Sequence, residues 1–320
     1  MGVLQTLDLV RFIVHVYQLH ESGSVEETLC PSGGGAFGGN DDSVTAALHW
    51  TLPCTDFDSM WESLYYDEPI KERLLQYAQT ALRFADAQVD PTIITLNRVI
   101  LLHGPPGTGK TTLSKALAQK LAIRLSKRFR CGQFIEINSH SLFSKYFSES
   151  GKLVLQMFKK ISEFVEDPDA FVCVLIDEIE SLTAARRGAM NGNEPSDLVR
   201  VVNAVLTQID QLKRRPNVLL MATSNLIDAI DNAFIDRADI KIHVKLPSST
   251  ASYHVLQSTV DELIRVSLLE KTSLVHLQKS SLMSMSRRAV EGGLSCRTLR
   301  KLAFLAYSNM SESTDIVRLT

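Results

Sequence analysis

The sequence predicts an α/β fold in which helices flank both faces of a parallel sheet. Between about residues 96 and 246, short apolar runs alternate with amphipathic helical patterns, as in sheets whose strands are joined by crossover helices. A glycine-rich loop links one apolar run to the next helical pattern, and a second apolar run ends in two carboxylates. Beyond Pro247 the pattern turns helical, so we expect a small all-α domain there.

The composition is that of a globular protein. The chain has 320 residues, of which 45% are hydrophobic and 22% are charged, and its net charge is −2; a chain of this length contains about two domains. A charge near zero predicts no bulk attraction to nucleic acid or membranes, and no apolar run approaches the ~18 residues of a membrane span. The five cysteines are scattered without metal-ligand spacing, which favours a reducing compartment, the cytoplasm or the nucleus.

We expect residues 1–90 to form a partial N-terminal α+β domain. Alternating apolar residues between Leu9 and Leu19 predict a strand. The segment from Gly33 to Gly39 is too rich in glycine to pack into a core. Helical spacing from Ile70 to Leu82 then predicts a helix, and Asp90-Pro91 breaks the pattern before the next domain.

The glycine-rich loop predicts a nucleoside triphosphate site. It fits G-x-x-x-x-G-K-S/T, and it lies between the apolar run Val99–Leu102 and a helical pattern over Thr111–Leu121. Such a loop closes its backbone N–H groups around phosphates at a helix N-terminus, while Lys110 bridges the β- and γ-phosphates and the Thr111 hydroxyl ligates Mg²⁺. The predicted ATP-binding residues are Gly104, Pro105, Pro106, Gly107, Thr108, Gly109, Lys110, Thr111 and Thr112.

A second motif supplies the carboxylates that hydrolysis needs. The apolar run Phe171–Ile176 reads as a buried central strand, and it ends in Asp177 and Glu178. In phosphoryl transfer one carboxylate holds Mg²⁺, the predicted role of Asp177, and another polarises the attacking water, the predicted role of Glu178. The expected strands are Val99–Leu102, Phe134–Ile137, Val172–Ile176, Val218–Ala222 and Ile240–Val244.

Residues after the fourth expected strand add a family resemblance. Asn225 follows this strand directly, and Arg237 lies in a Phe-Ile-Asp-Arg-Ala-Asp segment further on. Together with the two phosphate motifs, this block resembles the second region of homology of AAA+ ATPases. The resemblance implies that Asn225 senses the γ-phosphate and that Arg237 is an arginine finger completing the site of a neighbouring subunit in a ring. The alternative for Arg237 is a local ion pair with Asp236 or Asp239.

The helical tail carries one more candidate. Arg297 opens a helical pattern after Gly293-Leu294-Ser295-Cys296, and it matches the second sensor of AAA+ proteins, which reaches from the helical lid to the γ-phosphate. The alternative is an ordinary surface arginine. Cys296 stands where the family usually has glycine, which bears on how the lid packs.

Within this superfamily, the stretch from Glu136 to Lys152 resembles the pachytene checkpoint protein 2 family, also called thyroid receptor-interacting ATPases. The stretch Val201–Asp210 is similar to it as well. The resemblance implies a homohexamer that uses ATP to unfold part of HORMA-domain proteins with a HORMA-class adaptor. It also implies roles on meiotic chromosome axes and in the spindle checkpoint, in the nucleus, on chromosomes and in the cytoplasm, without direct binding of nucleic acid or membranes.

The same resemblance identifies a substrate-binding loop. Lys145, Tyr146 and Phe147 match the family loop that lines the central pore, where an aromatic side chain grips the substrate. The alternative is that both aromatic residues pack beneath the loop. Arg186 and Arg187, in a second candidate pore loop, are either substrate contacts or a solvated charge pair.

The family pattern sets the expected domains and leaves other functions open. We expect a large ATPase domain over 91–247 and an incomplete helical lid over 248–320, because family members continue beyond both ends of the resemblance. The alternative function is therefore a shortened regulatory form that binds ATP but hydrolyses it poorly. A guanine-nucleotide switch fits less well, because Asn225–Asp228 lacks the lysine of N-K-x-D and Asp177–Glu180 lacks the glycine of D-x-x-G.

Overall fold

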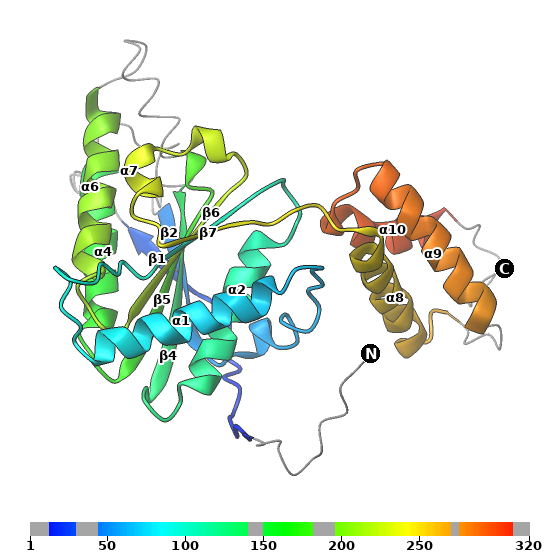
Figure 1. Cartoon of the computed structure of the whole chain (residues 1–320), viewed down its shortest axis with the longest axis horizontal. Coiled ribbons are helices and arrows are strands. Elements are labelled where there is room, and N and C mark those ends of the chain that lie inside the picture. The colour runs from blue at the N-terminus through cyan, green and yellow to red at the C-terminus, as the bar shows by residue number, and fades with distance from the viewer. Residues whose placement is uncertain (1–12, 30–43, 140–149, 182–195, 270–274, 310–320) are drawn as a thin grey trace, which may run out of the picture.

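The computed structural model describes residues 13–29, 44–139, 150–181, 196–269 and 275–309. Figure 1 shows a layered α/β body on one side and a separate group of helices on the other, joined by the chain that follows the last strand. The glycine-rich segment from Gly33 to Gly39 and both predicted pore loops lie outside the described residues.

Within the described residues, seven strands form one sheet in the order β1-β2-β4-β5-β6-β3-β7. The strands from β3 to β7 pair in parallel, and they confirm all five predicted strands. Two antiparallel strands that the sequence did not reveal extend the sheet beyond β4. The bounds are β1 (Val25–Leu29), β2 (Val44–Leu52), β3 (Val99–His103), β4 (Cys131–Asn138), β5 (Ala170–Asp177), β6 (Val218–Ser224) and β7 (Ile240–His243).

The predicted strand between Leu9 and Leu19 is wrong over its described part. Residues 13–19 have no strand structure, and Val14 and Val16 are 82% and 91% exposed. This described part of the chain bridges only to Cys54, just after β2, whose two edges already pair with β1 and β4, and residues 13–19 do not pair with the outer edge of β1. An alternating pattern forms a strand only where it pairs with a neighbouring strand, and here the chain makes no more than an isolated bridge between His20 and Cys54.

The region before residue 90 builds directly onto the sheet that contains the parallel strands. β2 pairs with β4, and helix α1 (Ile70–Asp86) packs against helix α2 (Lys110–Arg124). Trp50 and Phe57 pack in one buried cluster with residues of α2 and β4. The predicted domain boundary at residue 90 therefore falls in the loop between α1 and β3, while the sheet and its core extend across it.

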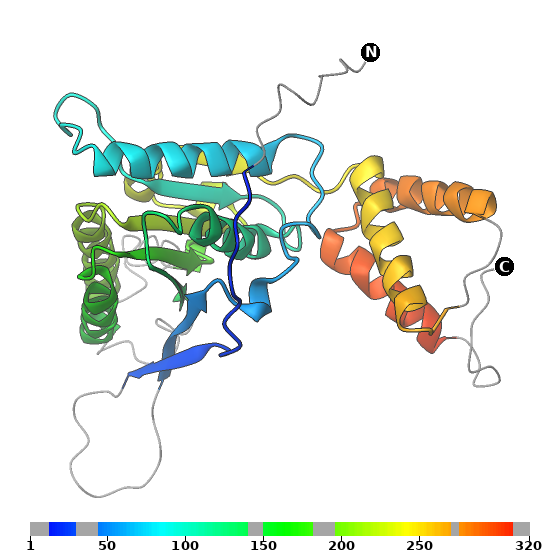
Figure 2. The same ribbon diagram turned by 90° about the horizontal axis from the view of Figure 1, so that it is seen from below.

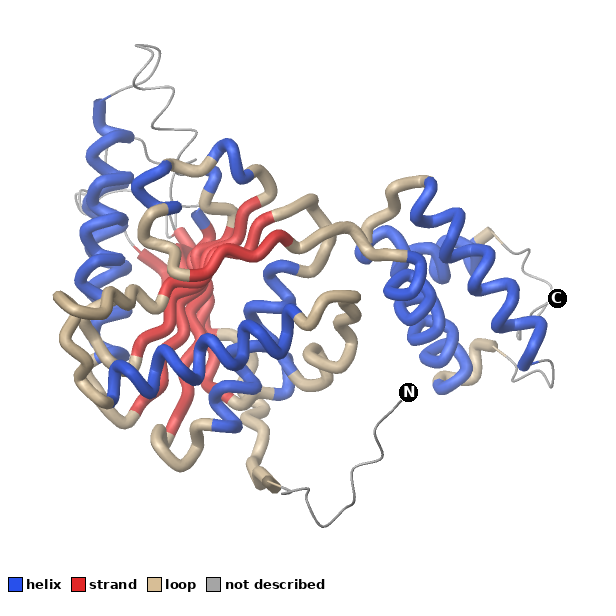
Figure 3. Tube along the Cα trace, viewed as in Figure 1, coloured by secondary structure: helices blue, strands red, loops and turns tan. Residues whose placement is uncertain are grey.

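Helices cover both faces of the sheet, as predicted. Figure 2 shows α1 and α2 on one face and α4 and α6 on the other, and Figure 3 shows the strands gathered between them. Each face has its own buried apolar cluster. The remaining elements of this body are α4 (Ser150–Val165), α6 (Ser196–Leu212), α7 (Asn232–Ile235) and the short 3₁₀ helices η2 (Thr55–Phe57) and η3 (Ile227–Ala229).

The predicted all-α tail is confirmed by α8 (Ser249–Arg265), α9 (Val275–Glu291) and α10 (Cys296–Ser308). Their small core contains Val255, Leu282 and Leu299. Serine hydroxyls cap two of these helices by accepting backbone hydrogen bonds, Ser248 at α8 and Ser295 at α10. None of the described helices combines the length and apolar character needed to cross a membrane.

We predict that Phe134→Ala strongly destabilises the chain. Phe134 is fully buried in β4, and its ring lies 5.3 Å from that of Phe57 and 5.8 Å from that of Trp50. Emptying such a site costs about 3–5 kcal/mol of unfolding free energy. Phe304→Ala is the matched control, because Phe304 is 73% exposed. Urea unfolding followed by circular dichroism would contradict the packing if the two variants had equal midpoints.

Candidate active site

The phosphate loop depends on three glycines with positive φ. It begins directly after β3 and ends where α2 starts, and Gly104, Gly107 and Gly109 have φ angles of 143°, 75° and 92°. A Cβ atom on Gly104 would lie 2.3 Å from the Val244 carbonyl oxygen, and one on Gly107 would lie 2.6 Å from Ser295 Oγ. Glycine is therefore required at these positions for two reasons: it allows the turn, and it leaves room for the chain just after β7 and for Ser295 of the lid, which approach the loop closely.

Lys110 is a buried cation held at the mouth of this loop. Only 6% of the residue is exposed. Its ammonium donates to the carbonyl oxygens of Gly104 and Pro105, each at 2.8 Å, and to Asn225 Oδ1 at 2.9 Å. Burial is the main cause that lowers the pKa of Lys110, and the nearby carboxylates of Glu180 and Asp177 oppose it. The structure thus brings together two predicted residues that lie 115 positions apart.

The two predicted metal ligands also meet. The Thr111 hydroxyl donates to Asp177 Oδ1 at 3.0 Å, and the Thr223 hydroxyl donates to the same oxygen. Mg²⁺ takes oxygen ligands and is usually held by one or two protein carboxylates together with substrate phosphates. A hydroxyl and a carboxylate in contact beside a phosphate loop therefore fit Mg²⁺, which Thr111 and Asp177 would hold.

Glu178 follows Asp177 through an unusual backbone turn. Its φ angle is 55°, a left-handed conformation that costs about 1–3 kcal/mol in a residue with a side chain. The backbone N–H of Glu178 donates to Thr223 Oγ1 at 3.1 Å, and its carbonyl accepts from the Ser139 hydroxyl at 2.9 Å. These contacts hold an exposed carboxylate at the edge of the phosphate site.

Most of the predicted site residues line one cavity of about 140 Å³. Gly104, Pro105 and Thr108 support it from behind, because the first two accept hydrogen bonds from Lys110 and the hydroxyl of Thr108 bonds to the Pro105 carbonyl. The lining residues are Pro106, Gly107, Gly109, Lys110, Thr111, Thr112, Asp177, Glu178, Thr223, Asn225 and Arg297.

Arg297 places the lid in direct contact with the phosphate loop. Its backbone N–H donates to the Gly107 carbonyl at 3.1 Å, and the residue lines the same cavity as Lys110 and Glu178. Cys296 precedes it and is half-buried, and burial raises the pKa of its thiol. The small tail domain thus takes part in the nucleotide site.

Sequence reasoning missed the residues of an adjoining cavity of about 370 Å³. Met60, Leu64, Tyr65 and Tyr66 line it together with the phosphate loop and Val255 of the lid. Its apolar and aromatic lining suits a planar base next to the phosphate site. The tyrosine pair before α1 is the signal that could have indicated it, but these residues lie some 40 positions before the loop and meet it only in the fold.

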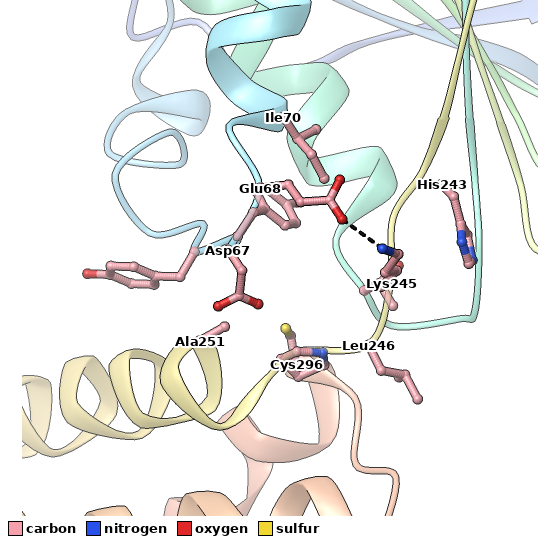
Figure 4. Close-up of a pocket in the computed structure, with 12 residues that line it drawn as sticks. Asp67, Glu68, Ile70, His243, Lys245, Leu246, Ala251 and Cys296 are labelled. Carbon is pink, nitrogen blue, oxygen red and sulfur yellow. Dashed lines mark hydrogen bonds and ion pairs between the residues drawn. The ribbon is translucent and has the colours of Figure 1, made fainter.

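Asp67 and Glu68, which follow the tyrosine pair of this cavity, also contact the linker to the lid. Figure 4 shows Glu68 and Lys245 joined across a smaller pocket, with the Cys296 side chain pointing into the space between them. The Lys245 ammonium lies 2.7 Å from Glu68 Oε1, and the Ser248 hydroxyl donates to Asp67 Oδ1 at 2.6 Å. The chain before α1 therefore contacts the nucleotide cavities and the linker together.

Arg237 lies apart from these cavities and has a partner that the sequence did not indicate. Its Nε and Nη2 donate to the two carboxylate oxygens of Asp210 on α6, at 2.9 and 2.8 Å. Hydrogen bonding to Arg237 is the main cause that lowers the pKa of Asp210, to about 2. The two alternatives considered from sequence, Asp236 and Asp239, do not form this pair; Asp239 instead accepts from Tyr77 and Asn97.

The fold and this site together define an AAA ATPase. The model of the "ATPase family associated with various cellular activities (AAA)" matches residues 100–246, from β3 to the linker. The predicted fold class is confirmed by this match and by the structure of PCH-2 from C. elegans. That structure has a TM-score of 0.78 and 39% sequence identity, over 95% of this chain and 74% of that one.

The chain belongs to the pachytene checkpoint protein 2 family of these ATPases. It is 50% identical to the pachytene checkpoint protein 2 homolog of Xenopus tropicalis, over 98% of this chain and 74% of the relative. The homolog of Homo sapiens is also 50% identical, over 95% of this chain and 72% of the relative. The sequence resemblance is thereby confirmed, and the chain is an ATPase.

We predict that Lys110→Met weakens ATP binding. Loss of charged hydrogen bonds of this kind lowers affinity by about 10- to 100-fold. Lys120→Met is the matched control, because Lys120 lies on the same helix and its ammonium pairs with the exposed Glu62 at 2.7 Å. Titration with a fluorescent ATP analogue would contradict the assignment if both variants bound it as the unchanged chain does.

Proposed function

We propose that this chain uses ATP hydrolysis to unfold part of HORMA-domain proteins, together with a HORMA-class adaptor. The observation that carries the proposal is that one cavity is lined by the phosphate loop, the β5 carboxylates and Arg297 of the lid. A nucleotide held between two bodies biases their arrangement whenever its phosphates change, since it contacts both. Such a motion is what an enzyme that pulls on a folded substrate needs.

The class of substrate comes from the family resemblance and from one neighbour. A structure titled as a HORMA:CdnC:Trip13 complex from E. coli MS115-1 has the same fold, with a TM-score of 0.56 and 17% identity over 84% of this chain and 96% of that one. That title names a HORMA protein in complex with Trip13, which supports HORMA proteins as the substrates of this chain. We place its work on meiotic chromosome axes and in the spindle checkpoint, in the nucleus and cytoplasm.

The chemistry follows from the residues around the cavity. The phosphates lie on the loop at the N-terminus of α2, where the helix dipole favours anions, and Lys110 neutralises their charge. Bound Mg²⁺ supplies further charge neutralisation on the phosphate oxygens. Glu178 orients the attacking water, and Asn225 reports on the γ-phosphate through its contact with Lys110.

The substrate is gripped in this proposal by Lys145, Tyr146 and Phe147, which lie outside the described residues. Their segment joins the carboxyl end of β4 to the start of α4, at Ser150. The carboxyl ends of β4 and β5 pair in register up to Asn138 and Asp177. The chain therefore leaves β4 at the edge of the nucleotide site, and the pore-facing role of the residues that follow is proposed from the family resemblance alone.

We predict that Glu178→Gln leaves the binding of ATP and substrate intact and abolishes the unfolding of the substrate. The amide keeps the size of the side chain and removes the base, so this variant is expected to bind ATP and a HORMA-domain protein and to leave that protein folded. Hydrogen exchange of the HORMA protein, with ATP present, measures this. Glu166→Gln is the control, because Glu166 is an exposed carboxylate just after α4.

Two outcomes of this experiment would contradict the proposal. Faster exchange in the HORMA protein with Glu178→Gln would mean that hydrolysis is not the driving step. ATP binding without turnover in the unchanged chain would favour the alternative, a regulatory form that binds nucleotide and partner only.

We predict that Arg237 acts on the neighbouring subunit. Arg237→Ala alone and Lys110→Met alone are each expected to lower turnover, by up to about 10³-fold for the arginine. An equal mixture is expected to recover about a quarter of the turnover, because in a ring one junction in four pairs an intact loop with an intact arginine. Mixed hexamers without recovery, identified by native mass spectrometry, would contradict a finger supplied from the next subunit.

A further inference from the structure

Thr223 makes an unusual pair of contacts between strands β5 and β6. The residue is 1% exposed and lies next to the carboxyl end of β5. Its hydroxyl donates to Asp177 Oδ1 and accepts from the Glu178 backbone N–H at 3.1 Å. A hydroxyl has one hydrogen to donate and lone pairs to accept, so a single orientation satisfies both contacts.

We propose that Thr223 is a positioning residue for ATP hydrolysis, which fixes the carboxylate of Asp177 and the backbone of Glu178 with one hydroxyl. The two carboxylates have different roles, since Asp177 would hold Mg²⁺ and Glu178 would orient the attacking water. Their side chains are adjacent in sequence, so a rotation of the peptide between them would move both. Thr223 binds the Asp177 side chain and the Glu178 backbone N–H, and so it fixes the positions of the two residues relative to each other.

The left-handed turn at Glu178 explains why such a clamp is needed. A non-glycine residue keeps a φ angle of 55° only where its surroundings impose it. Thr223 imposes it from β6, where its own carbonyl also accepts from the Ile179 N–H at 3.0 Å. Ser139 imposes it from the other side, because its buried hydroxyl shares its single hydrogen between the carbonyl oxygens of Asp177 and Glu178.

Thr223 also connects this turn to the phosphate loop. Two residues further along the same chain, Asn225 accepts a hydrogen bond from the Lys110 ammonium at 2.9 Å. The chain at the end of β6 therefore contacts the Asp177 carboxylate and the Glu178 backbone through Thr223, and the phosphate-binding cation through Asn225. Losing the Thr223 hydroxyl would release the Asp177 carboxylate and the Glu178 backbone N–H while leaving the contact between Asn225 and Lys110 in place.

This difference gives the test. Thr223→Val keeps the shape of the side chain and removes the hydroxyl, and it is expected to lower kcat by about 10- to 100-fold, as for other residues that orient metal ligands. ATP affinity measured in EDTA is expected to stay within about threefold, because Lys110 and the loop are unchanged. Thr223→Ser keeps the hydroxyl and is expected to restore kcat to within about fivefold of the unchanged chain.

A matched control and an equilibrium measurement complete the experiment. Thr207→Val removes a hydroxyl that bonds to the Asn203 carbonyl on α6, outside the site, and kcat is expected to stay unchanged. The gain in ATP affinity on adding Mg²⁺ is expected to fall about 10-fold in Thr223→Val alone. This readout needs neither turnover nor a HORMA protein, so it is independent of the proposed remodelling function.

Two results would overturn the proposal. One is a folded Thr223→Val with kcat and Mg²⁺ dependence within about twofold of the unchanged chain; the other is a Thr223→Ser that loses as much as Thr223→Val. If thermal melting shows that Thr223→Val does not fold, Ser139→Ala tests the same turn, because it removes the hydrogen bond to the Glu178 carbonyl. This variant is expected to have a lower kcat and an unchanged ATP affinity in EDTA.

Discussion

The burial of the Lys110 ammonium is the constraint on which the rest of the site depends. A buried charge is tolerated only when hydrogen-bond partners replace water, and here two loop carbonyls and Asn225 Oδ1 do so. The carbonyls require the glycine turn, and Asn225 requires that β6 lie beside β3. Loop conformation and strand order are therefore two consequences of satisfying one cation, which is also the group that meets the phosphates.

The lid is attached to this rigid centre by contacts of a different strength. Besides Arg297 on the loop, the lid and its linker make exposed polar contacts, among them Lys245 with Glu68 and Arg300 Nη2 with the Ser63 carbonyl, and Tyr65 packs against the apolar cluster of the lid. Exposed ion pairs contribute about 0–1 kcal/mol each. The phosphate site thus lies between a sheet with two large buried clusters and a lid with a much smaller one, and a nucleotide that contacts both bodies biases how the lid sits on the sheet.

The sequence predicted those features whose causes are local. Glycine spacing before Lys110 and apolar runs such as Val172–Ile176 determine the loop and the parallel strands without reference to distant residues. The predicted strand around Val14 failed because a strand needs a partner strand beside it, and residues 13–19 pair with none, which the pattern alone cannot show. Two further features were missed because only the fold brings distant residues together. One is the pair Tyr65 and Tyr66 beside the cavity that suits a planar base, and the other is Asp210 as the partner of Arg237.

The pair between Arg237 and Asp210 orients the arginine and leaves it able to act elsewhere. Asp210 binds the Nε and Nη2 edge of the guanidinium, and the Ala233 carbonyl accepts from Nη1 at 2.6 Å. Nη1 and Nη2 each carry a second N–H. With a pKa of about 2, Asp210 is an anion at neutral pH and keeps this edge fixed. Because the pair is partly exposed, the remaining N–H groups are available for the proposed contact with a phosphate of a neighbouring subunit, while Asp210 on α6 and Ala233 on α7 fix the guanidinium.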